Sequence, residues 1–236
     1  MLGQLRVLHY NVGKRKQVQW SLLNDTELAE FDAIAVVEPY LYKDIDTGEP
    51  RHGNHRQWQP VIPSIQRTDG HERHKYRAML WINSKHQAKA IPILSYDIAA
   101  ALVTLAGREV LLIAAYDPRD TINNRSQQEE DLAQKIQLIK GAIDKIQEGR
   151  EDGNVVDVLI CSDFNRHDAL WGGQRAMKAA GRQGEAEPII DFAQEYNLQS
   201  LLEPGTITWQ HQTLGWHSTV DVILASTRIA LSLIHI

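Results

Sequence analysis

Short apolar runs that stop abruptly at polar residues constrain this sequence more than any other feature. Residues 33–37 and 155–160 are almost continuously apolar, which is typical of strands buried on both faces. Two further runs, 97–105 and 109–116, flank Gly107 in a segment that predicts a hairpin. Strands buried on both faces need a layer on each side, so the sequence predicts a layered α/β sandwich rather than a doubly wound parallel sheet.

Helices and further strands are expected between these runs. The strongest helix spans 124–147, where Leu132, Ile136, Ile139, Ile143 and Ile146 fall on one face. Two other helices are expected at 17–30 and 188–196, and further strands at 5–11, 77–82, 206–209 and 218–224. Residues 40–75 are polar and weakly periodic, and they predict a long loop with one short strand near Val61.

Composition excludes several classes of protein. The 236 residues carry 25 basic and 30 acidic side chains, a net charge of −5, which argues against a nucleic-acid binder held by bulk positive charge. The single cysteine, Cys161, excludes a disulfide framework and indicates an intracellular, reducing compartment. No signal peptide and no apolar segment of membrane-spanning length is present, so we expect a soluble chain without a membrane partner.

Polar side chains stand at the ends of the apolar runs. They are Asn11, Glu38, Tyr116, Asp163 and Asn165. Strand ends that meet at one edge of a sandwich bring such side chains into one pocket, and carboxylate and amide oxygens are the ligands that Mg²⁺ prefers. Each position also has an ordinary interpretation, because Asn and Asp after a strand are common turn residues and a strand tyrosine is often half-buried.

Five segments carry a resemblance to a known family. They are Leu8-His-Tyr-Asn11, Val37-Glu38-Pro39, Ala115-Tyr116-Asp117-Pro118, Ser162-Asp163-Phe164-Asn165 and Ser218-Thr-Val-Asp221. In this order they resemble the endonuclease/exonuclease/phosphatase superfamily. The run from Asp163 to Gly173, Asp-Phe-Asn-Arg-His-Asp-Ala-Leu-Trp-Gly-Gly, resembles the endonuclease domain of LINE-type (non-LTR) retrotransposons.

The resemblance implies a fold and an activity. The expected fold is a four-layer α-β-β-α sandwich in which residues 1–236 form one domain. The expected activity is hydrolysis of a DNA phosphodiester bond with Mg²⁺, or alternatively Mn²⁺, that nicks target DNA for retrotransposition. A reverse transcriptase domain is expected in the full-length polyprotein, and the nucleus is the expected location.

The resemblance also assigns catalytic roles to the polar residues. Glu38 would ligate the metal, with Asn11 helping to place metal or phosphate. Asp163 would orient or deprotonate the attacking water, while Asn165 holds a phosphate oxygen. Tyr116 would stabilise charge in the transition state, since in-line attack at phosphorus needs charge neutralisation and a positioned water.

Further positions belong to the expected site or its edge. By the same resemblance Asp221 is an acid that supports the site, and Thr208 and Ser218 support phosphate or the polar network. Asp221 on its own could equally be a strand-edge acid. His167 is expected at the rim of the pocket or in a solvated loop.

A short basic cluster follows Asn11. Lys14 and Arg15 have two interpretations, a solvated helix start or contacts with the DNA backbone.

The end of the chain departs from the family pattern. The family ends in Ser-Asp-His on its last strand, whereas this chain ends Leu-Ile-His235-Ile236 without that motif. We therefore expect a C-terminally truncated copy that lacks the last strand, and a loss of about 10²–10⁴ in rate without the histidine. Two alternatives stay open, namely a phosphatase or phosphodiesterase of the same superfamily, and an inactive remnant that only folds or binds DNA.

Overall fold

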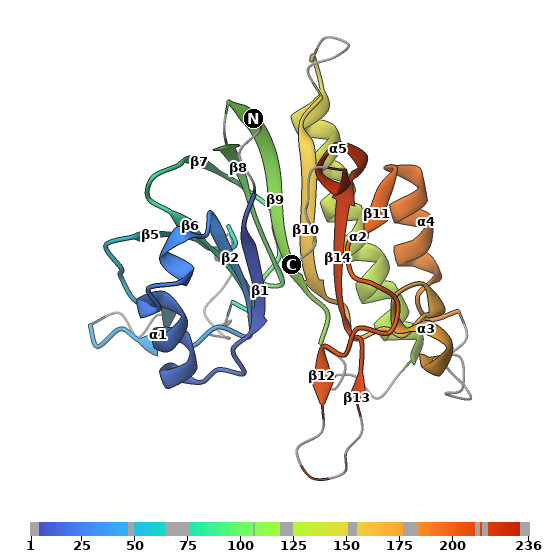
Figure 1. Ribbon diagram of the computed structural model, residues 1–236, viewed down its shortest axis with the longest axis horizontal. Coiled ribbons are helices and arrows are strands. Elements are labelled where there is room, and N and C mark those ends of the chain that lie inside the picture. Colours follow the sequence, from blue (N-terminus) through green and yellow to red (C-terminus); the bar gives the residue numbers. More distant parts are fainter. Residues whose placement is uncertain are drawn as a thin grey trace.

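Four layers of helix and sheet make up the described part of the chain (Figure 1). The computed structural model describes residues 5–46, 50–64, 76–105, 107–118, 125–150, 155–176, 184–210, 213 and 217–231. Helix α1 (Lys16–Asn24) covers one sheet, and helices α2 (Arg125–Gln147) and α4 (Glu187–Glu195) cover the other. The expected four-layer α-β-β-α sandwich is confirmed.

The first sheet has four strands in the described residues. Its order is β1 (Val7–Asn11), β2 (Ala33–Val37), β6 (Ala78–Asn83) and β5 (Trp58–Val61). The pair β1 and β2 is parallel, with Asn11 beside Val37, and the other neighbours are antiparallel. Because parallel neighbours need a crossover, α1 connects β1 to β2, and β1 lies at an edge of this sheet.

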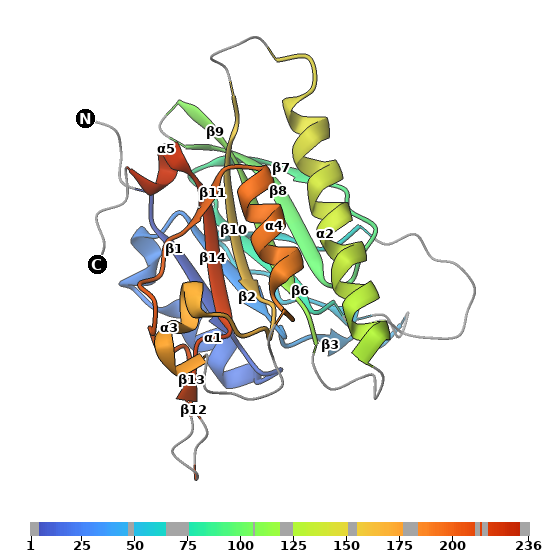
Figure 2. The same cartoon turned by 90° about the vertical axis from the view of Figure 1, so that its right-hand side faces the viewer.

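The second sheet has six strands in the described residues. Its order is β11 (Leu198–Ser200), β14 (Asp221–Ser226), β10 (Asp157–Asp163), β9 (Arg108–Tyr116), β8 (Ile98–Leu105) and β7 (Gln87–Ile91). Strands β8 and β9 form the predicted hairpin. Strands β9 and β10 are parallel and α2 crosses between them, and Figure 2 shows α2 and α4 lying across the outer face of this sheet.

Smaller elements lie outside the two sheets. Strand β3 (Tyr42–Lys43) pairs with β4 (Pro50–Arg51), and β12 (Trp209–Gln210) pairs with β13 (His217–Ser218). The short helices are the 3₁₀ turn η1 (Leu28–Glu30), α3 (Ala169–Ala176) and α5 (Thr227–Ala230). None of the helices in the described part of the chain is long and apolar enough to span a membrane.

The expected helix at 17–30 is too long. Helix α1 ends at Asn24 because Asp25 is extended and its Oδ1 accepts the backbone N–H groups of Glu27 and Leu28, at 2.8 and 3.3 Å. This local turn competes with the helical hydrogen bonds. Likewise, residues 40–75 are not one loop with a single strand, since β3, β4 and β5 all fall there.

In the second sheet β7 and β11 were not predicted, nor were the short helices α3 and α5. The strand β7 is largely exposed and β11 has only three residues, so neither has a clear apolar pattern. The expected strands at 206–209 and 218–224 are β12 and β14 with shifted bounds, because Thr219 and Val220 separate β13 from β14. The expected absence of a last strand concerns the end of the chain, where residues 232–236 lie outside the described residues.

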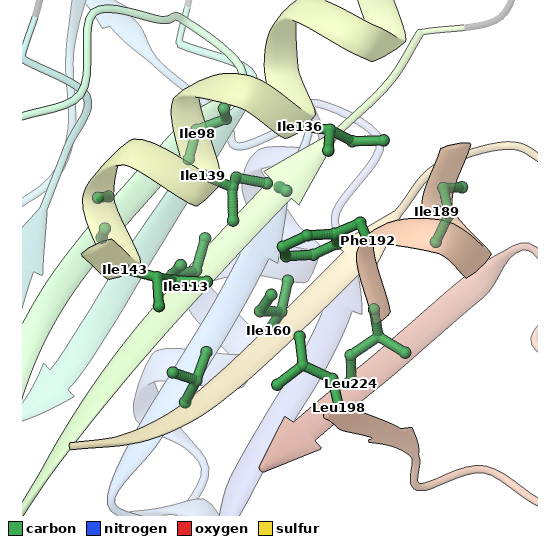
Figure 3. Packing of buried hydrophobic residues seen from close by; sticks show 14 of the residues in the cluster. Ile98, Ile113, Ile136, Ile139, Ile143, Ile160, Ile189, Phe192, Leu198 and Leu224 are labelled. Carbon is green, nitrogen blue, oxygen red and sulfur yellow. The ribbon is translucent and has the colours of Figure 1, made fainter. Parts of the chain in front are cut away.

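Three apolar layers hold the sandwich together. Between the second sheet and its helices, Ile113, Ile139, Ile160 and Phe192 pack together (Figure 3). The alternate residues of β9 and β10 point the other way, into a second apolar layer between the two sheets. A third layer, with Trp58, lies under α1. The rim of the middle layer is where the strand-end polar residues emerge.

Truncation of Phe192 tests the layer beneath α4. We expect Phe192→Ala to lower the free energy of unfolding by about 3–5 kcal/mol, because the fully buried ring leaves a cavity. The neighbouring Asp191 is exposed, so Asp191→Ala is the matched control and should change stability by less than about 0.5 kcal/mol. Urea unfolding measures both, and equal effects would show that α4 does not pack as described.

Candidate functional site

One row of polar side chains crosses the second sheet at the rim of the middle apolar layer. On β10, Leu159 and Cys161 belong to that layer, so Asp163 faces the same side because side chains alternate along a strand. In the strand register Asp163 lies directly beside Tyr116 of β9 and beside Asp221 of β14. Three of the predicted site residues therefore stand side by side at the ends of adjacent strands.

The first sheet adds Asn11 and Glu38 to this row. The Asn11 Nδ2 group donates to Oε2 of Glu38 and to Oδ2 of Asp163, each at 3.2 Å. The Asn11 Oδ1 atom accepts the backbone N–H of Gly13 at 2.8 Å. One amide thus joins two carboxylates that come from different sheets and lie far apart in the sequence.

Two of the predicted site residues, Glu38 and Asn165, have an unusual backbone conformation. Glu38 has φ 47° and Asn165 has φ 52°, in the left-handed region that most residues avoid. The Asn165 backbone N–H donates to Oδ1 of Asp163 at 3.2 Å, and its Nδ2 donates to the carbonyl oxygen of Asp117 at 3.0 Å. These bonds hold the turn after β10 in place, and strained positions of this kind concentrate at functional sites.

His9 is a site residue to which the sequence analysis gave no role. Its Nε2 lies 3.0 Å from Oδ1 of Asp221, and the imidazole is only 4% exposed. It contacts the row because it precedes Asn11 by two residues on β1, and side chains two apart share a face. That spacing was the signal in the sequence that could have predicted it.

Burial and neighbouring charge both act on Asp163. Burial, and after it the nearby Asp221 carboxylate, raises the pKa of Asp163 from its ordinary value to about 7. The Asn11 amide, His9 and the Asn165 backbone N–H oppose this rise in the pKa. Asp163 is therefore a carboxyl group that gains and loses a proton near neutral pH, which suits a general base.

A chain of buried charges supports the turn from the side of α2. Lys135 lies 2.6 Å from Oδ1 of Asp117 and 3.3 Å from Oδ2 of Asp97. Arg166 is 2.8 Å from Oδ2 of Asp117, and Arg77 pairs with Asp97. Sequence reasoning missed these residues, since a lysine on an amphipathic helix usually belongs to its solvated face.

Thr208 supports the site through the backbone of β14. Its Oγ1 accepts the backbone N–H groups of Val220 and Asp221, at 3.0 and 3.2 Å. The Thr208 backbone N–H in turn donates to the carbonyl oxygen of Ser218 at 3.0 Å. These contacts fix where Asp221 begins its strand, so Thr208 acts on the polar row through Asp221.

The remaining predicted residues lie around this centre. Lys14 is 3.0 Å from Oε1 of Glu38, and Arg15 is exposed at the start of α1. His167 is half-buried before α3, where its backbone N–H donates to Glu185 at 3.3 Å. Through this ion pair the Lys14 side chain contacts Glu38 of the polar row.

The donor set at this rim fits a hard divalent cation. Glu38 is partly exposed, and Asn11 contacts both it and Asp163. Mg²⁺ is typically bound by one or two carboxylates while it keeps several waters. Within the described residues, no group of three His, Cys, Asp or Glu side chains is arranged to hold a metal ion by itself. Glu38 could hold Mg²⁺ here with water completing the coordination, and Asn11 could add its Oδ1 only with its amide turned, because its Nδ2 now faces the carboxylates.

The fold matches solved nucleases and phosphatases over nearly the whole chain. The endonuclease domain of TRAS1, a telomere-specific non-LTR retrotransposon, superposes with a TM-score of 0.69 at 16% identity, covering 95% of this chain and 86% of that one. The AP endonuclease LMAP from Leishmania major gives 0.66 at 13% identity, covering 96% and 80%. The mannosyl-6-phosphatase Bt3783 from Bacteroides thetaiotaomicron gives 0.58 at 12% identity, covering 95% and 86%. The chain thus has the fold of the endonuclease/exonuclease/phosphatase type.

The sequence places the chain in a narrower family. The model of the family described as endonuclease-reverse transcriptase matches residues 110–235, more than half of the chain. The chain therefore belongs to the endonuclease-reverse transcriptase family. No curated protein sequence matches it.

The pKa of Asp163 predicts how stability depends on pH. The unfolded carboxyl loses its proton near pH 4 but the folded one only near 7, so the free energy of unfolding falls as pH rises between these values and then levels off. Asp163→Asn removes this fall, and we expect the variant to be more stable than the wild type at pH 8 by on the order of 2 kcal/mol. Urea unfolding in EDTA at pH 4 and pH 8 measures the difference. An equal gain at both pH values would contradict the raised pKa.

Removal of Lys135 tests the buried chain of charges. Lys135→Met leaves Asp97 and Asp117 close together without their shared cation, and we expect a loss of about 3–5 kcal/mol in the free energy of unfolding. Lys140→Met is the control on the same helix, because its partner Glu195 is exposed and such a pair contributes about 0–1 kcal/mol. Similar losses for both variants would contradict the structural role of Lys135.

Proposed function

We propose that this chain hydrolyses phosphodiester bonds of DNA with the help of Mg²⁺, or Mn²⁺ in its place. The observation that carries the proposal is the contact of Asn11 with both Glu38 and Asp163. It brings together a carboxylate suited to a metal ion and a carboxyl group suited to accept a proton. Glu38 is partly exposed at the rim of the sandwich and Asp163 is buried there, next to Asn165, whose amide suits a phosphate oxygen.

Each residue has a role that follows from its place. Glu38 would hold the metal, with Asn11 helping to place it, and the chemistry that bound Mg²⁺ would supply is neutralisation of charge on a phosphate oxygen. Asp163 orients the attacking water and accepts its proton. Asn165 uses one N–H to bond Asp117, which leaves its second N–H to hold a phosphate oxygen.

The flanking residues of the row stabilise the reacting group. Tyr116 stands beside Asp163 in the strand register, and we assign to it stabilisation of negative charge in the transition state. Asp221 supports Asp163 from the other side and is itself held by His9 and Thr208. Ser218, His167, Lys14 and Arg15 are proposed to contact the substrate around this centre.

The family suggests where this reaction takes place. We propose that residues 1–236 form one domain, that its substrate is target DNA in the nucleus, and that a reverse transcriptase domain accompanies it in the full polyprotein. The nick would then provide the primer end for reverse transcription. This proposal draws on the description of the family and on the likeness to a retrotransposon endonuclease domain.

Nicking of supercoiled plasmid is the direct test. We expect conversion to the open circle with Mg²⁺ and none in EDTA. Glu38→Ala and Asp163→Ala should each lower the rate by at least about 10²-fold, in the range for loss of a metal ligand or general base. Asp191→Ala, an exposed acid on α4, should leave the rate unchanged.

The alternatives give different results in the same assay series. Release of phosphate from small phosphomonoesters without plasmid nicking would indicate a phosphatase instead. Folded protein that neither nicks plasmid nor releases phosphate at any Mg²⁺ or Mn²⁺ concentration would contradict the proposal and indicate an inactive remnant.

A further inference from the structure

Both oxygens of the Glu38 carboxylate already have partners in the protein. The Lys14 ammonium lies 3.0 Å from Oε1, and the Asn11 amide donates to Oε2 at 3.2 Å. The Lys14 side chain is 61% exposed and the Glu38 side chain 22%. The group best placed to hold a metal ion is therefore paired with a largely exposed cation from the neighbouring turn.

The backbone keeps Lys14 next to Glu38 whatever its side chain does. Lys14 has φ 58° and Glu38 has φ 47°, so both residues adopt the left-handed conformation. The Lys14 backbone N–H donates to the carbonyl oxygen of Glu38 at 2.8 Å, and that of Val12 donates to Val37 at 3.0 Å. The main chain is thus anchored, while the four-carbon stem of Lys14 can swing without moving it.

The ammonium and a divalent cation compete for the same carboxylate. An ion bound at Glu38 would meet a like charge at about 3–5 Å, which opposes its binding. The lysine member of the ion pair is exposed, and ion pairs at the surface shift an equilibrium by about fivefold or less. A divalent ion can therefore displace Lys14, but its apparent affinity is lower than it would be without the lysine.

We propose that Lys14 is a tethered cation that holds Glu38 in the metal-free protein, gives way to the divalent ion, and then pairs with a phosphate group of the substrate. The inference rests on the proposed function in one respect only, that Glu38 is a metal ligand. It assigns to Lys14 a role that the general DNA-contact interpretation of the basic cluster does not contain. It also explains why a basic residue stands beside a carboxylate that would serve a cation.

Binding of Mn²⁺ tests this role without any measurement of activity. The dissociation constant is measured by electron paramagnetic resonance of free Mn²⁺ at about 0.1 M salt, where the Debye length is about 10 Å. We expect Lys14→Met to tighten binding by about fivefold, and Lys14→Arg to stay near the wild type because it keeps the charge. Lys16→Met removes an equally positive, exposed residue two positions away and should change binding by less than twofold.

The possible outcomes separate this inference from the proposed function. Loss of Mn²⁺ binding in Glu38→Gln shows that the ion binds at Glu38. If the wild type and Lys14→Met then bind Mn²⁺ equally, the role of Lys14 alone is overturned. Equal tightening by Lys14→Met and Lys16→Met also overturns it, since only general charge would matter. Absence of Mn²⁺ binding in every variant overturns both the inference and the metal dependence. Tighter binding in Lys14→Met without plasmid nicking supports the inference and contradicts the proposed function.

Discussion

The site depends on one amide that bridges two sheets. Asn11 donates to Glu38 on its own side of the sandwich and to Asp163 on the other, so the relative placement of the two carboxylates is set by how the sheets pack. The apolar layer between them, from Val37 to Leu112 and Leu159, is fully or nearly fully buried. Because close-packed interiors resist sliding, this packing fixes the distance between the two acids.

The charged groups at and behind this rim are paired with hydrogen-bond donors or opposite charges. Burial and the neighbouring Asp221 raise the pKa of Asp163, whereas the Asn11 amide, His9 and the Asn165 backbone N–H lower it. Behind it, Asp117 and Asp97 share Lys135 and each has an arginine of its own. Buried charges are tolerated where they are paired in this way, and the pairs hold the turn that carries Asn165.

The sequence was informative where one residue pattern determines the structure. The continuous run at 33–37 became β2 with the expected bounds, because a short run of apolar residues fits a strand that is buried on both faces. The strand-end positions of Asn11, Glu38 and Asp163 predicted their convergence, which follows from the rule that strand ends share a rim. Here local pattern and global fold agree.

Features that depend on contacts between distant segments of the chain could not be predicted from the sequence. The register that puts Tyr116 and Asp221 on either side of Asp163 depends on pairing between strands far apart in the chain. In the sequence Lys135 has the pattern of an ordinary polar helix residue, and only the fold places Asp97 and Asp117 beside it. The end of α1 at Asn24 depends on two hydrogen bonds to Asp25 that outweigh helix propensity.

Glu38, held by Asn11 near Asp163, is the site that we propose for a divalent metal ion. Anomalous diffraction from crystals grown with Mn²⁺ tests it most directly, because the signal locates the ion without reference to activity. We expect a peak beside the Glu38 carboxylate that is absent from crystals of Glu38→Gln. A peak bound elsewhere with none at Glu38, or a peak that persists in Glu38→Gln, would contradict it.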